Sequence, residues 1–476
     1  MSDNKLGIVM TNALYFDSNL VPSGTMRKIR RKFREIDPKF NRNSKRGLSV
    51  ENQSKYLNLF TRGSDGLFSV PRGCATVLTD ILDRDSIEYE FIDERLVLDE
   101  IDIPNKLSDG FKLFPFQEKC SKLGSLLTQG VIKSPCGSGK TVTGIDLIRR
   151  IRQPTLVIVP DTELMYQWVE RLVGVLGMDE DNIGLIGDGW DVVLDVTIGT
   201  VQSLYKRVDD TRFCNKFGMV MLDEAHMVGA RTFREVMHSF PAKYRFGLTA
   251  TPFRNDNLTD LIQYYCGKQF YEVTDEELSK YNLLIKPELI IRNTEFFINY
   301  DRRDDQMHNK MLKAMYNDKK RNTLICKDII KEYKQGRLSL IVAKRADHCD
   351  ILRDMLLKME PKIRVADMSG NDYDVDSVER ARKNKVDVVL SVNRAVQGLD
   401  IQNLENLFMV APRKSLGEIE QIVGRIMRPS VCNGKYKTPK DKVARVYDYY
   451  DAKMEYGVKG SFNNRMSVYE EKCIVK

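Results

Sequence analysis

Short apolar runs alternate with amphipathic segments over most of the chain. Between residues 108 and about 285, these runs are rich in β-branched residues and are separated by stretches with helical character. This pattern is typical of parallel strands covered by helices on both faces, and it predicts a doubly wound α/β domain. The runs lie at Val131–Lys133, Thr155–Val159, Val196–Ile198, Met219–Leu222 and Phe246–Leu248.

The same alternation returns after about residue 290 and predicts a second domain of the same class. Its apolar runs lie at Leu338–Ala343, Ile363–Ala366, Val386–Ser391, Leu407–Ala411 and Ala444–Tyr447. The segment Lys280–Pro287 is the predicted hinge. The domains are therefore expected at 108–285 and 286–476.

Residues 1–107 follow a different pattern and predict a smaller α+β domain. A strand-like run at Gly7–Phe16 precedes a basic helix from Met26 to Glu35, which Pro38 ends. A further helix is expected near Thr76–Leu82, followed by strand-like runs between Ile87 and Ile103. Pro104-Asn105 marks the predicted boundary.

Composition narrows the class of protein. The chain has 476 residues, of which 42% are hydrophobic, but no apolar run approaches the roughly 18 residues of a membrane span. The N-terminus lacks the apolar core of a signal peptide. The nine cysteines form no CxxC pair and there are only four histidines, so we expect reduced thiols, no zinc module and a cytoplasmic protein.

The net charge of +8 is concentrated in one segment. Residues 27–46 hold ten basic and two acidic residues, so the rest of the chain is neutral overall. Such a block predicts a polyanionic partner, although a solvated helix face is the alternative. The candidate contacts in the helix are Arg27, Lys28, Arg30, Arg31, Lys32 and Arg34.

A glycine-rich loop follows the first predicted strand of the domain at 108–285. The sequence Ser134-Pro135-Cys136-Gly137-Ser138-Gly139-Lys140-Thr141 matches the phosphate-binding P-loop, except that Ser134 replaces the first glycine. Its backbone N–H groups can converge on phosphate at a helix N-terminus. Lys140 is expected to reach the β- and γ-phosphates of ATP, and the Thr141 hydroxyl to bind Mg²⁺.

An acidic pair ends another buried strand. Asp223 and Glu224 directly follow Met219–Leu222. At the end of a parallel strand, Asp223 is expected to hold Mg²⁺, and Glu224 to orient and deprotonate the attacking water.

These motifs and several others, in the same order, resemble the superfamily 2 helicases and translocases. Asp223-Glu224-Ala225-His226 resembles their DEAH box, and Gln421-Ile422-Val423-Gly424-Arg425-Ile426-Met427-Arg428 matches QxxGRxxR. Thr249-Ala250-Thr251 and Gln397-Gly398-Leu399-Asp400 resemble two further motifs. The resemblance covers about residues 108–450, implies two RecA-like domains, and is closest to the phage branch-migration helicases of the UvsW type and to the XPB and RecG groups.

The resemblance implies roles for particular residues. Gln421, Arg425 and Arg428 would stabilise the transition state, and Gly398 and Asp400 would contact ATP, as would Gln117. His226, Thr249 and Thr251 would couple hydrolysis to movement. Gln167, Thr200 and Gln202 would grip DNA, and Arg72 lies in a Val70-Pro71-Arg72-Gly73 segment similar to one in the phage group. The helical spacing around Trp168 favours a core position over stacking on bases.

The leading hypothesis is an ATP- and Mg²⁺-dependent DNA helicase or translocase acting on forks, junctions and the single strands within them, in replication, recombination and repair. The resemblance implies a monomeric motor, without a membrane partner, in the cytoplasm, or in a host's cytoplasm if phage-encoded. An RNA helicase, the motor subunit of a restriction enzyme and a non-catalytic DNA-binding switch are the alternatives. The intact Lys140, Glu224 and Arg425 set disfavours the last.

Overall fold

The fold is described from a computed structural model. It describes residues 5–37, 40, 54–135, 137–250, 259–301, 303–304, 306–370, 375–392, 401, 403–429, 431–432, 435–436, 442–454 and 456–475. The chain divides into two compact units, residues 1–134 with 139–273, and residues 135–138 with 274–476. None of the helices in the described ranges is long and apolar enough to cross a membrane.

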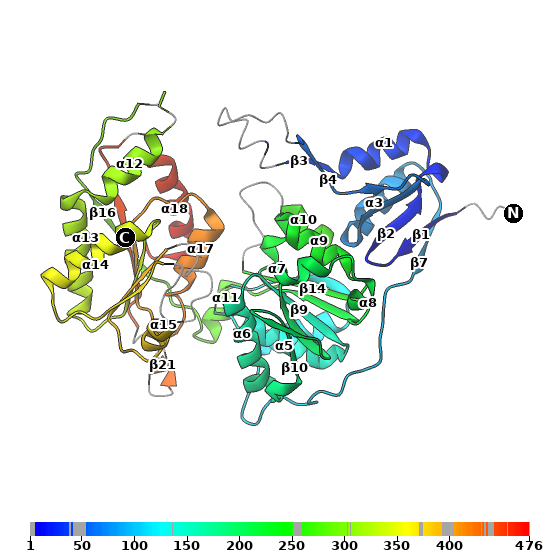
Figure 1. Ribbon diagram of the computed structural model, residues 1–476, viewed down its shortest axis with the longest axis horizontal. Coiled ribbons are helices and arrows are strands. Elements are labelled where there is room, and N and C mark those ends of the chain that lie inside the picture. The colour runs from blue at the N-terminus through cyan, green and yellow to red at the C-terminus, as the bar shows by residue number, and fades with distance from the viewer. Residues whose placement is uncertain are drawn as a thin grey trace. The chain divides into compact units, whose positions relative to one another are not determined.

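The first unit begins with a small sheet of its own, drawn in blue in Figure 1. Its strand order is β5-β6-β2-β1-β7, with β1 and β7 parallel and the other pairs antiparallel. The predicted single strand Gly7–Phe16 is wrong, because Thr11 and Asn12 form a polar turn that reverses the chain. The elements are β1 (Leu6–Met10), β2 (Ala13–Asp17), α1 (Ser23–Lys32), β5 (Thr61–Arg62), β6 (Leu67–Pro71), α3 (Ala75–Arg84) and β7 (Tyr89–Asp93), with a separate pair β3 (Arg34–Ile36) and β4 (Tyr56–Asn58).

The larger sheet of the first unit is a doubly wound sheet with strand order β11-β10-β12-β9-β13-β14-β8-β15. All its strands are parallel except the edge strand β11. The strands are β8 (Gln129–Lys133), β9 (Thr155–Val159), β10 (Ile183–Gly187), β11 (Trp190–Val192), β12 (Val196–Thr200), β13 (Met219–Leu222), β14 (Tyr244–Thr249) and β15 (Gln269–Glu272). The five predicted strands are confirmed, and β10, β11 and β15 are additional.

Helices cover both faces of this sheet, as right-handed crossovers require. On one face α5 packs against α4 and α6, and on the other α9 packs against α7 and α10. The helices are α4 (Pro115–Ser125), α5 (Lys140–Ile151), α6 (Thr162–Arg171), α7 (Val201–Leu204), α8 (Thr211–Cys214), α9 (Arg231–Ser239) and α10 (Thr259–Cys266). Because the strands are parallel, their carboxyl ends line one edge, where the candidate site lies.

The second unit holds an all-parallel six-stranded sheet in the order β16-β23-β20-β17-β19-β18. Its strands are β16 (Glu288–Asn293), β17 (Ser339–Val342), β18 (Val365–Met368), β19 (Val388–Ser391), β20 (Asn406–Met409) and β23 (Arg445–Tyr450), with a small hairpin of β21 (Val431–Cys432) and β22 (Lys435–Tyr436). The helices are α11 (Asp275–Lys280), α12 (Met307–Tyr316), α13 (Lys319–Tyr333), α14 (Ala346–Met359), α15 (Val375–Arg382), α17 (Leu416–Gly424) and α18 (Lys459–Lys472). Two RecA-like α/β domains and a smaller N-terminal sheet are therefore the observed architecture.

The second unit begins at Thr274, before the predicted boundary at 285/286. The cause is visible in two contacts. Lys472 of α18 forms an ion pair with Asp275 of α11 at 3.4 Å, and the N–H of Ile285 donates to the carbonyl of Met427 at 2.8 Å. These contacts tie the predicted hinge to the second unit.

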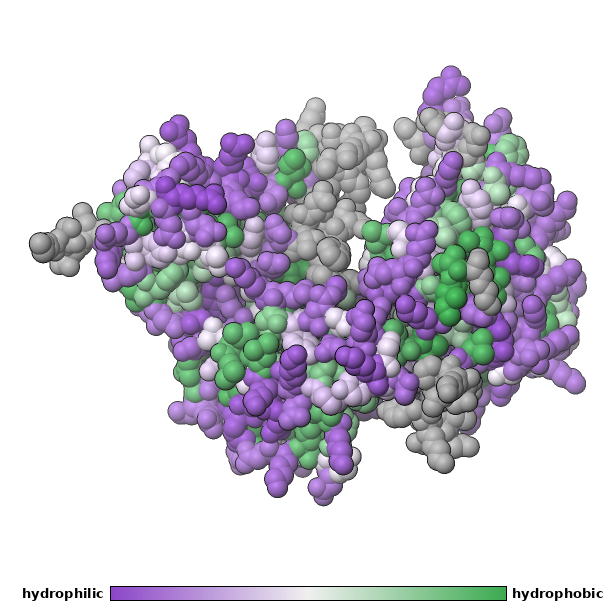
Figure 2. All heavy atoms as spheres, turned by 180° about the vertical axis from the view of Figure 1, so that it is seen from behind, coloured by the Kyte–Doolittle hydropathy of each residue, from purple (hydrophilic) through white to green (hydrophobic). Residues whose placement is uncertain are grey.

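One apolar core runs through the first unit. It joins buried residues of the small N-terminal sheet, such as Ile8 and Phe68, to residues of the larger domain, such as Leu222 and Phe240. On the face shown in Figure 2, hydrophilic side chains dominate and hydrophobic ones gather in scattered patches. Because the two parts share one apolar core, the N-terminal domain is packed onto the larger domain rather than merely tethered to it.

Candidate nucleotide site and nucleic-acid surface

The P-loop joins β8 to α5 at the carboxyl edge of the larger sheet. The N–H of Ser134 donates to the carbonyl of Thr249, at the end of the neighbouring β14, at 2.8 Å. The Ser138 hydroxyl donates to the carbonyl of Pro135 at 2.6 Å and tightens the turn. Gly139 has φ +81° and directly precedes α5, a conformation that a side chain would strain. Of the predicted loop residues, Cys136 lies outside the described residues.

Gln117, which the resemblance assigns to ATP binding, lies beside this loop. It is buried on α4, and its Oε1 accepts a hydrogen bond from the N–H of Phe114 at 3.0 Å. A Cβ on Gly139 would stand 2.3 Å from Gln117 Nε2. The glycine therefore makes room for the amide, although Phe114 stands where the family often has arginine.

The acidic pair lies at the end of β13, and Glu224 is held from two sides. Lys140 Nζ is 3.3 Å from Glu224 Oε1, and His226 Nδ1 is 3.1 Å from Glu224 Oε2. Burial favours the neutral acid, but Lys140 and His226 outweigh it and hold the pKa of Glu224 below its usual range. Glu224 also has φ +50°, an uncommon conformation for a residue with a side chain.

Asp223 has the opposite electrostatic setting. It is buried, and desolvation together with the adjacent Glu224 raises its pKa above the usual value. Its Oδ1 accepts from the N–H of Glu224 at 2.8 Å. The surroundings thus push the pKa values of the two neighbouring carboxyl groups apart and favour Glu224 as the charged member of the pair.

Trp168 holds the other oxygen of Asp223. Its indole Nε1 donates to Asp223 Oδ2 at 2.8 Å, and the ring is fully buried, which confirms the predicted core position. A Cβ on Gly144 of α5 would stand 2.9 Å from the ring, so the helix packs directly on the indole. Sequence reasoning missed the hydrogen bond, although a tryptophan in a core normally needs an acceptor for its N–H.

The residues at this edge fit a magnesium-bound nucleotide. The Thr141 hydroxyl and the Asp223 carboxylate are hard oxygen ligands of the kind Mg²⁺ prefers, and Mg²⁺ usually completes its shell with water and substrate phosphate. In keeping with so few protein ligands, the described residues contain no group of three or more His, Cys, Asp or Glu that could hold a metal. Lys140 and the backbone N–H groups of the loop are positively polarised groups that could bind phosphate.

The second unit carries the residues of the QxxGRxxR motif. Gln421 lies on α17, Arg425 is the C-cap of that helix, and both are largely buried, whereas Arg428 is partly exposed. The carbonyl of Arg428 accepts a hydrogen bond from Lys442 at 2.7 Å.

Thr249 is buried at the end of β14. The predicted Thr251, Gly398 and Asp400 lie outside the described residues.

The predicted nucleic-acid contacts differ in their exposure. Gln202 is exposed and Gln167 is partly exposed, but Thr200 is only 4% exposed and its hydroxyl donates to Ser203 at 3.1 Å. In α1, Met26 and Ile29 are buried, and the basic residues project outward. Arg27, Lys28, Arg31, Lys32 and Arg34 are exposed, Arg30 is partly exposed, and Lys28 pairs with Asp85 at 2.6 Å.

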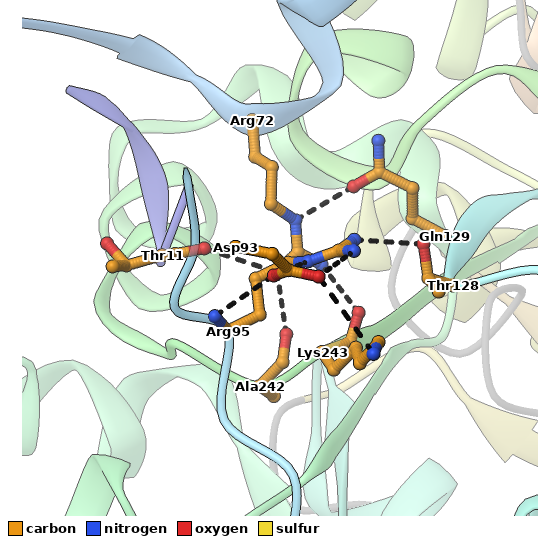
Figure 3. Close-up of polar contacts among 8 residues, drawn as sticks. All are labelled: Thr11, Arg72, Asp93, Arg95, Thr128, Gln129, Ala242 and Lys243. Atoms are coloured by element: carbon orange, nitrogen blue, oxygen red, sulfur yellow. Dashed lines mark hydrogen bonds and ion pairs between the residues drawn. The ribbon is translucent and has the colours of Figure 1, made fainter. Parts of the chain in front are cut away.

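The predicted DNA contact of Arg72 is wrong. Its side chain is fully buried and binds the larger domain (Figure 3). Its Nε donates to Gln129 Oε1 at 2.8 Å, and Nη1 and Nη2 donate to the carbonyls of Ala242 and Lys243 at 2.6 and 3.2 Å. Burial, with a smaller effect of Arg245, lowers the pKa of Arg72. The guanidinium therefore fixes the N-terminal domain to the first motor domain instead of meeting solvent.

Gly73 explains the rest of this segment. A Cβ there would stand 2.0 Å from the carbonyl oxygen of Gln263 on α10. Nearby, Asn12 Nδ2 donates to the carbonyl of His238 at 2.8 Å, and Arg95 bridges Asp93 and Thr128. The Val70-Pro71-Arg72-Gly73 segment is thus a docking seam between two domains.

Comparisons with known proteins identify two domain families along the chain. Residues 106–254 match the family described as type III restriction enzyme, res subunit, and residues 302–430 match the helicase conserved C-terminal domain. The chain is 32% identical to the "DNA 3'-5' translocase XPB2" of Sulfurisphaera tokodaii over 193 residues, which cover 40% of this chain and 43% of that relative. The aligned region thus spans less than half the relative's length.

Two solved structures are also similar. A fragment of a putative HsdR subunit of a type I restriction enzyme from Vibrio vulnificus YJ016 aligns with a TM-score of 0.55 and 17% identity, covering 76% of this chain and 67% of that one. T4 UvsW aligns over 99% of both chains with a TM-score of 0.45 and 17% identity. Both domain families match in order along the chain around the P-loop and the DEAH box, and these matches, together with the XPB relative, support a superfamily 2 helicase related to the XPB proteins.

Proposed function

We propose that this protein is an ATP-dependent DNA translocase that unwinds or branch-migrates forked and junction DNA. The observation that carries the motor part of the proposal is the contact between Lys140 of the P-loop and Glu224 of the acidic box, with Asp223 held beside them. A relative named as a DNA translocase supports DNA as the track.

The residues of the first motor domain divide the chemistry among them. Lys140 would bind the β- and γ-phosphates, while Thr141 and Asp223 would hold Mg²⁺, which would neutralise charge on the phosphates. As Lys140 turns to the phosphates it leaves Glu224, and His226 then remains as the partner of that carboxylate. Glu224 is thereby freed to orient and deprotonate the attacking water.

Arg425 and Arg428 supply positive charge late in the reaction. Arginines that meet the developing charge of the γ-phosphate contribute about 10³–10⁵ in rate in related systems. Because these arginines belong to the second motor domain, domain closure couples to ATP binding and opening to hydrolysis. Gln421 on the same helix assists their placement.

The N-terminal domain grips the duplex arms of the substrate. Its α1 presents exposed basic residues, and the Arg72 seam makes it part of the first motor body. A pull on the tracked strand would therefore be transmitted against the gripped arm. Contacts of this kind go to phosphates and carry no sequence information.

The test is ATP hydrolysis measured with single-stranded DNA, duplex DNA, a fork, a four-way junction and RNA as activators, with Lys140→Ala as the control. We expect the fork and junction to stimulate hydrolysis most. If RNA stimulates hydrolysis and none of the DNA substrates does, the protein moves along RNA and not along DNA. Cleavage of duplex DNA by the purified protein would favour the restriction-motor alternative.

A further inference from the structure

The chain has two tryptophans, and the structure gives them opposite environments. Trp168 is fully buried, whereas Trp190 is 53% exposed at the start of β11. Tyr166 on α6, two residues before Trp168, is 43% exposed. An exposed tryptophan beside an exposed tyrosine is a large apolar surface to leave in water, and such surfaces mark binding sites.

A hydrogen bond fixes the tyrosine of this pair. The hydroxyl of Tyr166 donates to Asp188 Oδ2 at 2.9 Å, and the indole of Trp190 lies close enough to act on the pKa of that hydroxyl. Gly187, Asp188 and Gly189 all have positive φ and form the tight turn between β10 and β11. The polar edge of Tyr166 is thus satisfied within the protein, and the exposed aromatic surface of both rings remains for another partner.

The pair lies at the same edge of the sheet as the nucleotide site. Gly187 ends β10 and Thr200 ends the parallel neighbour β12, just as Ser134 and Asp223 follow β8 and β13. A Cβ on Gly187 would stand 2.8 Å from Thr200 Oγ1, so the turn packs against the start of α7, which carries the exposed Gln202.

Charge near the pair is balanced, because Asp188 and Asp191 are offset by Arg207 and Lys206. Arg207 forms an ion pair with Asp191, the residue after Trp190, and so offsets that carboxylate. Lys206 beside it is exposed. A flat base has a face that stacks on an aromatic ring whatever its identity, which suits a motor that must step along any sequence.

We propose that Trp190 and Tyr166 form a stacking platform for the bases of a single DNA strand. The inference rests on the proposed function, because it assumes that the motor tracks DNA along this edge. The platform holds unpaired bases while the neighbouring polar residues contact phosphates. Duplex DNA, whose bases are already stacked, binds it poorly.

The experiment measures binding of a short oligothymidylate by intrinsic fluorescence and anisotropy. Stacking should quench the wild-type signal, and Trp190→Phe should lose most of that quenching, which assigns it to Trp190. Trp190→Ala should weaken binding roughly tenfold, within the range that one stacked base contributes. Tyr166→Phe keeps its ring but loses the hydrogen bond to Asp188, and should weaken binding less.

Val192→Ala is the matched control, because Val192 is 40% exposed on the same β-hairpin and has no aromatic face. It should bind as wild type, and hydrolysis without DNA should be unchanged in all four variants. Wild-type affinity in Trp190→Ala, or quenching that persists in Trp190→Phe, overturns the platform. If either of these results is seen while forks still stimulate hydrolysis by the wild type, only the platform is refuted. If no DNA stimulates hydrolysis by the wild type, the proposed function is refuted.

Discussion

Two sets of charged residues in the first compact unit differ in how the fold treats them. At the nucleotide edge, Lys140 and Glu224 have side chains only 11% and 19% exposed and face each other. On α1, Arg27 and Arg31 are exposed on the outer face of the helix. Low-dielectric surroundings strengthen each interaction of the first set, while water and salt screen the second. Single changes should therefore be decisive at the edge and small, additive and salt-dependent on the helix.

The largest effect is expected at Glu224. Glu224→Gln keeps the shape of the side chain but cannot accept the proton of the attacking water, so turnover should fall below a few per cent of wild type while ATP still binds. Steady-state hydrolysis and nucleotide binding measure the two properties. Glu170→Gln, an exposed position on α6, should be silent. Appreciable turnover in Glu224→Gln would contradict its role as the base.

The next largest effect concerns the arginines of the second motor domain. Arg425→Ala and Arg428→Ala should lower turnover by about 10³-fold or more with little change in ATP affinity, because the transition state needs them most. Arg364, exposed and paired with Asp387, provides the control Arg364→Ala. Loss of DNA binding with turnover intact would show that the residue contacts the track instead.

Arg72 breaks the simple contrast, because it is basic and lies in the N-terminal domain but is buried. Arg72→Met leaves Gln129 and the carbonyls of Ala242 and Lys243 without their donor. We expect the protein to lose about 3 kcal/mol of stability or more, measured by thermal or chemical unfolding. Arg62→Met, at an exposed position in the same domain, should cost little. If Arg72→Met is as stable as the wild type and its DNA affinity depends less on salt, the interpretation of Arg72 as a DNA contact would be correct after all.

Trp168 offers a smaller test of the buried set. Trp168→Phe keeps a ring against α5 but removes the N–H on Asp223 Oδ2. The Mg²⁺ concentration for half-maximal hydrolysis should rise several-fold, and saturating Mg²⁺ should restore most of the turnover. Trp190→Phe should leave the Mg²⁺ dependence unchanged. An unchanged Mg²⁺ requirement in Trp168→Phe would show that this hydrogen bond does not affect Mg²⁺ binding.

Local patterns predicted what depends on local sequence. The apolar runs Thr155–Val159 and Met219–Leu222 are strands with those bounds, because a buried parallel strand needs a continuous apolar segment. The P-loop and acidic box lie at one sheet edge, because parallel strands share their direction. Partners distant in sequence could not be predicted in this way.

Arg72 and Trp168 show why. Four residues around Arg72 do not reveal that carbonyls 170 positions later accept its hydrogen bonds. The helical spacing of apolar residues around Trp168 predicts that its side chain is buried, but it does not predict that Asp223 accepts the indole hydrogen bond. The edge strand β11 has three exposed residues and therefore no apolar run to mark it. Sequence gives the faces of elements, and tertiary packing decides which charges remain on the surface.

The central claim is that the buried charges drive hydrolysis while the exposed charges of the N-terminal domain grip DNA. One variant tests it most directly: Arg27, Arg31, Lys32 and Arg34 replaced by glutamine, all four exposed in the structure. The control makes the same change in net charge, because it replaces with glutamine four exposed lysines of the second unit: Lys319, Lys320, Lys331 and Lys334.

The measurement is junction affinity against salt concentration, with hydrolysis at saturating DNA recorded on the same samples. Each lost phosphate contact should reduce the slope of log K against log salt by about 0.9, so the N-terminal variant should lose up to about 3–4 units and the control little. Hydrolysis at saturating DNA should stay near wild type, and single-strand affinity should fall less than junction affinity. An N-terminal variant that keeps its salt slope and its preference for junctions would contradict the account.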